Sequence, residues 1–269
     1  MGVSRVRTEL EAAMGAVITS TAACDEFIDD PDGFAARYDL DATEAVSLVE
    51  MQKDLAELMP SFVQKRRRSL RNSSRRTLNV LGRGGDDLLN EYTDREPTAH
   101  RLRDDWLRFA EFVVERTEAV AATTAHGSFV AEVARFERAM VFSLQHGRSL
   151  KTVPPAQRTP ADLGFEPDRP MQLASPAALE AFTWDLRAIR KFDPRTAESV
   201  HPDPCVLLFF HTGSSRGSKV LRVHPDCVPA LDAIREAPGI SARAASADCV
   251  RPRHALNTLA QLHSQGGVA

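Results

Sequence analysis

Apolar residues recur at helical spacing through most of the first half of the chain. Leu102, Trp106, Phe109 and Val113 are four, three and four residues apart, which places them on one face of a helix. A second stripe of this kind runs from 128 to 146. We expect both segments to be core helices of an antiparallel bundle.

The first sixty residues carry weaker helical patterns. A one-sided apolar stripe covers 5–28, and the segment 29–34, with its proline and glycine, interrupts it. Asp41 followed by Glu44 predicts a helix start with a capping box, and apolar positions continue from there to Pro60. These patterns predict a small helical hairpin or three-helix unit.

The pattern changes after residue 150. Six prolines between 152 and 176 exclude a helix and indicate an ordered crossing or linker. The apolar run 205–210 and the run 219–223 are separated by a glycine-containing turn, which predicts a β-hairpin. Residues 179–189 fit a helix or a strand equally well, and short helical patterns complete the chain.

Together these elements predict an α+β fold that is mainly α. An N-terminal helical bundle precedes a small C-terminal, winged-helix-like domain. The expected segments are an N-terminal helical extension (1–60), a bundle (61–150), a proline-rich crossing (151–178) and a small α/β domain (179–269).

Composition narrows the class of protein. The chain is 43% hydrophobic and 26% charged, with a formal net charge of −3, so any surface for nucleic acid must be local. No apolar run approaches the roughly 18 residues of a membrane span, and the N-terminus lacks the features of a secretory signal. We therefore expect a cytoplasmic protein. None of the four cysteines belongs to a CxxC pair, which favours small buried hydrophobes over a metal site.

The most charged tract lies between residues 65 and 76, where seven of twelve residues are basic and none is acidic. A basic stripe of this kind can grip phosphate or an acidic partner. It can equally be the solvated face of a docked helix. We favour the solvated face, because the tract lacks the interleaved aromatic residues that stack on bases.

We find no catalytic motif. The sequence contains no HExxH, GxSxG or P-loop pattern, and the pairing of His211 with Ser214 or Ser215 would place a nucleophile on a flexible turn. Glu137 lies beside the apolar face of its helix, where a carboxylate needs a partner. We expect an ion pair with an arginine of the basic helix. No metal site and no catalytic residue are predicted in this chain.

The order of motifs resembles a known family. An arginine-rich helix with Arg67, Arg68, Arg71 and Asn72 is followed by FAEFV, FVAEVARFERA, a proline-rich crossing, ALEAFTWDLRAI and the hairpin. This looks like the partner-protein family that includes MbnC of methanobactin biosynthesis and TglI of thiaglutamate biosynthesis, some relatives of which are named DNA-binding proteins. The resemblance covers roughly 62–266.

The resemblance implies a non-catalytic subunit that pairs with a multinuclear-iron oxidase of the TIM-barrel type, which modifies cysteine in ribosomally made peptides. The iron would belong to that partner, and this chain would hold no cofactor. The helical domain would dock on the oxidase, and the C-terminal domain would bind the leader of the precursor peptide by strand addition. Residues 180–186 would then be a strand, giving a three-stranded antiparallel sheet.

These expectations assign two groups of residues. The candidate peptide-binding residues lie in the hairpin strands: Val206, Leu207, Leu208, Phe209, Phe210, Val220, Leu221, Arg222 and Val223. The candidates for partner docking or structural ion pairs are Arg67, Arg68, Arg71, Arg135 and Glu137.

Two other hypotheses stay open. The first is a DNA-binding transcriptional regulator, although residues 253–263 hold only one arginine and two histidines as positive or titratable groups, which is few for a recognition helix. The second is an enzyme with a scattered Cys/His site. We expect neither nucleic-acid nor membrane binding.

Overall fold

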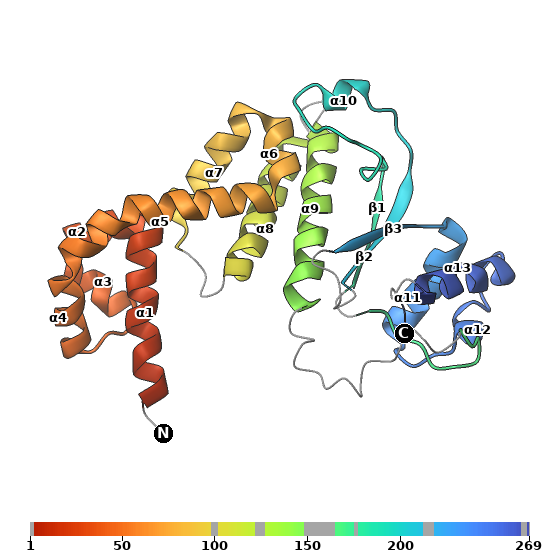
Figure 1. Cartoon of the computed structure of the whole chain (residues 1–269), viewed down its shortest axis with the longest axis horizontal. Coiled ribbons are helices and arrows are strands. Elements are labelled where there is room, and N and C mark those ends of the chain that lie inside the picture. Colours follow the sequence, from red (N-terminus) through yellow and green to blue (C-terminus); the bar gives the residue numbers. More distant parts are fainter. Residues whose placement is uncertain are drawn as a thin grey trace. The chain divides into compact units, whose positions relative to one another are not determined.

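The structure is a computed structural model of the whole chain, and it describes residues 3–97, 102–121, 127–147, 165–174, 177–211, 218–264 and 268. The chain forms two compact units, Met1–Val120 and Ala121–Ala269. The fold is mainly helical in its N-terminal region and ends in a small three-stranded antiparallel sheet with helices, as the sequence predicts (Figure 1). None of the helices among the described residues has the length and apolar content that crossing a membrane requires.

The N-terminal unit contains helices only, among its described residues. They are α1 (Val3–Thr19), α2 (Thr21–Asp29), α3 (Pro31–Arg37), α4 (Ala42–Glu50), α5 (Gln52–Ser73), α6 (Arg75–Leu81), α7 (Arg83–Arg95) and α8 (Leu102–Ala121).

Side-chain caps set several of these helix starts. Ser20 accepts a hydrogen bond from the amide of Ala23 and separates α1 from α2, so the stripe over 5–28 belongs to two helices. Asp30 caps α3, which begins at Pro31, so the segment 29–34 ends one helix and starts the next. The predicted capping box of Asp41 and Glu44 is confirmed at the start of α4.

The expected boundary at residue 60 falls inside α5, because Pro60 does not end this helix. Leu55 and Val63, on either side of the proline, are both buried, and this packing outweighs the hydrogen bond that proline removes. The basic tract is divided between α5 and α6. The division between the compact units falls after residue 120, within the segment 61–150 that was expected to form one bundle.

The glycine-rich break is also shorter than its sequence indicates. Gly82, with a φ of 59°, is the only residue between α6 and α7. Gly85 lies within α7, where a Cβ would come within 2.5 Å of the carbonyl oxygen of Leu78. The missing side chain therefore lets α7 approach the backbone of α6.

The C-terminal unit contains α9 (Gly127–Gly147), β1 (Ala177–Phe182), α10 (Thr196–Ser199), β2 (Cys205–Phe210), β3 (Lys219–Val223), the 3-10 turn η3 (Pro225–Cys227), α11 (Val228–Glu236), α12 (Ala242–Ala245) and α13 (Pro252–Ser264). The strand order is β1-β2-β3, with both pairs antiparallel. The predicted hairpin is confirmed, whereas its turn (212–217) and most of the proline-rich crossing (151–164 and 175–176) lie outside the described residues.

Helices cover both faces of this sheet (Figure 1). On one face, the ring of Phe136 from α9 packs against Phe209, with ring centroids 5.3 Å apart, and against Phe182 at 6.0 Å. On the other face, Leu208 and Phe210 enter a core shared with α11, α12 and α13. The central strand β2 is therefore buried on both sides.

Two expectations about this unit need correction. The strand expected at 180–186 is present but begins and ends earlier, because the chain bends after Phe182 and Leu186 is buried in the following turn. The aromatic stripe of α9 packs on the sheet, where the sequence predicted helix–helix packing. A helical stripe indicates a buried face without indicating the kind of element that covers it.

Candidate functional site

The predicted peptide-binding residues divide between a central strand and an edge strand. Val206 is half-buried, and the other four residues of the β2 group, Leu207, Leu208, Phe209 and Phe210, are fully buried. Because β1 and β3 pair with β2 on its two sides, its backbone has no side free for an incoming strand. The β2 residues support the sheet, and an added strand can pair only with β1 or β3.

The outer edge of β1 is engaged by α9 at its carboxyl end. Glu132 accepts hydrogen bonds from the amide of Thr183 at 2.8 Å and from its hydroxyl at 2.7 Å. Arg135 extends over the ring of Phe182 and donates to the carbonyl oxygen of Ala181 at 3.5 Å. These contacts assign Arg135 a structural role.

The outer edge of β3 is more open. Lys219 and Arg222 are exposed, and Val220 and Leu221 are half-buried. Within the part of the chain that the structure describes, no strand pairs with the side of β3 that faces away from β2. This edge presents backbone donors and acceptors that an extended peptide can pair with.

Arg222 ties the end of β3 to the long connection between β1 and β2. Its guanidinium donates to both carboxylate oxygens of Asp203, at 2.7 and 2.9 Å, and lies 3.5 Å from Asp185. Asp185 also receives a bidentate contact from Arg187. Hydrogen bonds from Arg187 hold the pKa of Asp185 below its ordinary value, and those from Arg222 do the same for Asp203. Arg222 is thus fixed beside the open edge.

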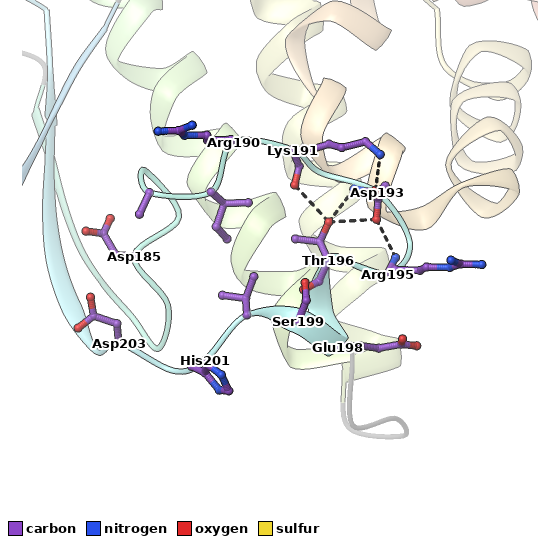
Figure 2. Close-up of a pocket in the computed structure, with 13 residues that line it drawn as sticks. Asp185, Arg190, Lys191, Asp193, Arg195, Thr196, Glu198, Ser199, His201 and Asp203 are labelled. Carbon is purple, nitrogen blue, oxygen red and sulfur yellow. Dashed lines mark hydrogen bonds and ion pairs between the residues drawn. The ribbon is translucent and has the colours of Figure 1, made fainter.

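The same connection lines an open pocket of about 800 Å³ (Figure 2). It was not expected from the sequence, because most of its residues lie beyond the segment ALEAFTWDLRAI, in a connection with no motif. It is lined by Asp185, Ala188, Ile189, Arg190, Lys191, Asp193, Arg195, Thr196, Glu198, Ser199, Val200, His201 and Asp203.

Polar groups around this pocket mainly hold the loop together. The hydroxyl of Thr196 accepts from the amide of Asp193 at 2.8 Å and donates to the carbonyl oxygen of Lys191. The ammonium group of Lys191 lies 2.9 Å from the Asp193 carboxylate, and this contact lowers the pKa of Asp193. Figure 2 shows the side chains of Arg195 and Glu198 pointing away from the pocket.

The pocket therefore lacks the arrangement needed for nucleophilic catalysis. Ser199 donates its hydroxyl to the carbonyl oxygen of Thr196 at 3.1 Å, whereas an activated serine requires a neighbouring base as its acceptor. No group of three or more metal-ligating side chains occurs among the described residues. All four cysteines are buried, and burial raises the pKa of each thiol, which disfavours the thiolate that binds metals or attacks substrates.

Two arginines of the basic tract form ion pairs near the surface of the N-terminal unit. Arg67 donates to Asp94 at 2.7 Å and to the hydroxyl of Thr93, and Arg71 pairs with Asp86. These contacts favour structural ion pairs for the two arginines, whereas Arg68 is exposed. Glu137 is buried in α9, only 6% exposed, and its predicted ion pair with an arginine of the basic helix stays a prediction.

The most deeply buried charge of the tract was not singled out from the sequence. The side chain of Arg66 is 3% exposed and makes a bidentate contact with the fully buried Asp105, at 2.9 and 2.8 Å. Tyr92 donates its hydroxyl to the same carboxylate, and the Arg66 guanidinium lies 5.1 Å from its ring centroid. The signal was present, because Arg66 lies between Val63 and Leu70 on the apolar face of α5.

In comparisons with known proteins, no protein-family model and no curated protein matches this chain.

Proposed function

We propose that this chain is a non-catalytic subunit of a cytoplasmic peptide-modifying complex. It binds the leader segment of a precursor peptide along β3 and docks on a multinuclear-iron oxidase that modifies peptide cysteine. The observation that carries the proposal is the open outer edge of β3, in a sheet whose two faces are covered by helices. The motif order of the sequence supports the identity of the partner.

Strand addition explains how such an edge selects a peptide. Main-chain hydrogen bonds supply affinity without regard to sequence, and side chains that alternate along the edge supply specificity. The half-buried Val220 and Leu221 offer apolar contacts, and the exposed Arg222 offers a cation that Asp203 and Asp185 hold in place.

A pair of proline substitutions tests the binding edge. Along an edge strand, alternate amides point toward the neighbouring strand or away from it, and proline is tolerated only at the second kind of position. Of Val220→Pro and Leu221→Pro, we expect one to unfold the sheet and the other to remain folded while it loses binding of the leader peptide by about tenfold or more. Calorimetry with the leader of the precursor encoded beside this chain measures the binding.

The matched control places the same pair of prolines on the opposite edge, at Ala178 and Leu179. The variant of that pair that stays folded should bind the leader as the unmodified chain does. Unchanged binding by the folded β3 variant, or failure of the chain to co-purify with the neighbouring iron oxidase, would overturn the proposal.

The alternative, a DNA-binding regulator, has less support. Arg66, Arg67 and Arg71 are paired with carboxylates, and the helix α13 packs its apolar face into the core. Tight duplex binding that weakens steeply with salt would favour the regulator instead.

A further inference from the structure

Exposed apolar side chains are concentrated at the start of the chain. Six large hydrophobic residues are exposed among the described residues, and five of them lie between 28 and 62: Ile28, Val46, Val49, Leu58 and Phe62. The sixth, Val250, lies in the other unit. Single exposed apolar residues are ordinary, whereas a cluster marks an interaction surface.

One face of α5 carries two of these residues in adjacent turns. Leu58 is 48% exposed and Phe62 is 37% exposed, and their spacing of four residues places them one above the other on the helix. Further along the same face, the indole of Trp106 from α8 donates to the hydroxyl of Ser69 at 2.8 Å. Helix α8 thus covers the later part of this face and leaves Leu58 and Phe62 open.

Two cations continue the open face. The ammonium group of Lys65 lies 5.1 Å from the ring centroid of Phe62, and Arg68 follows one turn later. Both side chains are exposed, and no carboxylate lies within ion-pair distance of either in the described part of the chain. Their neighbours Arg66, Arg67 and Arg71, in contrast, are neutralised by aspartates.

The open face therefore has an apolar half and a cationic half. Two exposed carboxylates, Asp54 and Glu57, add negative charge at its beginning. A partner that covers this face must offer apolar side chains to Leu58 and Phe62 and carboxylates to Lys65 and Arg68. A helix that lies along α5 can present both from one side, at spacings of three and four residues.

We propose that the α5 face formed by Leu58, Phe62, Lys65 and Arg68 binds an acidic amphipathic helix of a second polypeptide. Burial of the two apolar side chains supplies affinity, and the two cations select a partner with carboxylates in register. This docking surface lies on the N-terminal unit and does not depend on peptide binding by the sheet, so either proposal can fail alone.

A labelled synthetic helix tests this surface on the full chain. The probe is an amphipathic peptide of about 18 residues, long enough to form helix, with Leu and Phe on one side and Glu one turn beyond them. Its counterpart carries Lys at each Glu position. Fluorescence anisotropy should show that the Glu peptide binds at least about tenfold more tightly than the Lys peptide, with an affinity that falls as salt rises.

Two double variants separate the halves of the face. Leu58→Ser with Phe62→Ser should abolish binding, and Lys65→Glu with Arg68→Glu should reverse the preference between the two peptides. Val250→Ser and Arg190→Glu, which change an exposed apolar residue and an exposed arginine in the other unit, serve as matched controls and should leave binding unchanged. Circular dichroism confirms that each variant is folded, and the charge variant decides the question if the apolar variant unfolds.

Several outcomes would overturn the proposal. One is equal affinity for the two peptides, and another is an affinity that neither double variant changes. A dimer that disappears with the apolar variant would assign the face to a second copy of this chain. Binding of duplex DNA that is lost only in the charge variant would assign it to nucleic acid.

Discussion

At the scale of single residues, the N-terminal unit depends on one buried ion pair. Arg66 contacts three other helices through its guanidinium: Asp105 of α8, the ring of Tyr92 in α7 with the carbonyl oxygen of Glu96 that follows it, and the carbonyl oxygen of Thr19 in α1. Burial raises the pKa of Tyr92 first of all, and the charge of Asp105 raises it further, so its hydroxyl stays a donor to that carboxylate. The buried pair is well satisfied, because all three guanidinium nitrogens of Arg66 and both carboxylate oxygens of Asp105 have hydrogen-bond partners.

Arg66→Met tests this dependence. Removal of one partner leaves Asp105 as an uncompensated buried charge, so we expect the free energy of unfolding to fall by about 3–5 kcal/mol. Arg68→Met, which changes an exposed arginine two positions away, should change it by no more than about 0.5 kcal/mol. Urea denaturation measures both values, and equal effects would show that the buried pair is not the cause.

The raised pKa of the Cys227 thiol should make the stability of the fold depend on pH. Burial raises its pKa from 9.0 to about 12. Above pH 9 the unfolded chain loses this proton while the folded chain keeps it, so the unfolded state is favoured as pH rises and the stabilisation is lost between pH 9 and 12. The loss amounts to about 1.4 kcal/mol per pH unit within this window.

Denaturation at pH 8 and pH 10 tests whether stability falls as pH rises and whether Cys227 causes the fall. The unmodified chain should lose more stability between the two values than Cys227→Ala does. If the two chains lose the same amount, the dependence arises from other groups, such as the remaining buried thiols.

At the scale of elements, close backbone packing fixes the pair α6 and α7. Gly85 has no room for a Cβ against the backbone of Leu78, whereas a Cβ at the preceding Gly84 would meet no atom within 4 Å. These adjacent glycines in one helix therefore have different effects. Gly85 permits close contact between the two helices, whereas Gly84 makes no such contact and only lowers the helix propensity of α7.

The two alanine variants should change the free energy of unfolding in different directions. Gly85→Ala must push α7 away from α6, and we expect a loss of about 1–3 kcal/mol. Gly84→Ala should be neutral or stabilising by up to about 1 kcal/mol, because alanine favours helix over glycine. Thermal unfolding compares the two variants. A destabilising Gly84→Ala, or a neutral Gly85→Ala, would contradict the packing argument.

At the scale of the whole molecule, the chain offers one tryptophan for each compact unit. Trp106 lies on α8 in the N-terminal unit, and Trp184 packs edge-on against Phe129 in the C-terminal unit, with ring centroids 5.2 Å apart. The fluorescence of each reports the unfolding of its own unit.

Single-tryptophan chains can follow the two units separately. In Trp184→Phe, where Trp106 is the reporter, addition of Arg66→Met should lower the urea midpoint. In Trp106→Phe, where Trp184 is the reporter, the same substitution should have a much smaller effect. Equal shifts of both midpoints would show that the units unfold as one cooperative body.

The sequence by itself determined the class of elements, their order and much of the core. The stripes that became α8 and α9, the capping box at Asp41 and the hairpin strands β2 and β3 follow from local periodicity and local hydrogen bonding, which a sequence records directly. The helix boundaries at Ser20, Asp30 and Gly82 also depend on local interactions. Their sequence patterns, however, are compatible with a longer helix or a longer loop as well as with the boundary that is present.

Only the tertiary structure decided which charges are structural and which edge is open. Seven basic residues in one tract look alike along the chain, and the aspartates that neutralise Arg66, Arg67 and Arg71 come from segments 15 to 39 residues away. The pairing order made β2 central and left β3 at an edge. Both outcomes depend on contacts between distant segments, and a pattern of neighbours in sequence carries no record of such contacts.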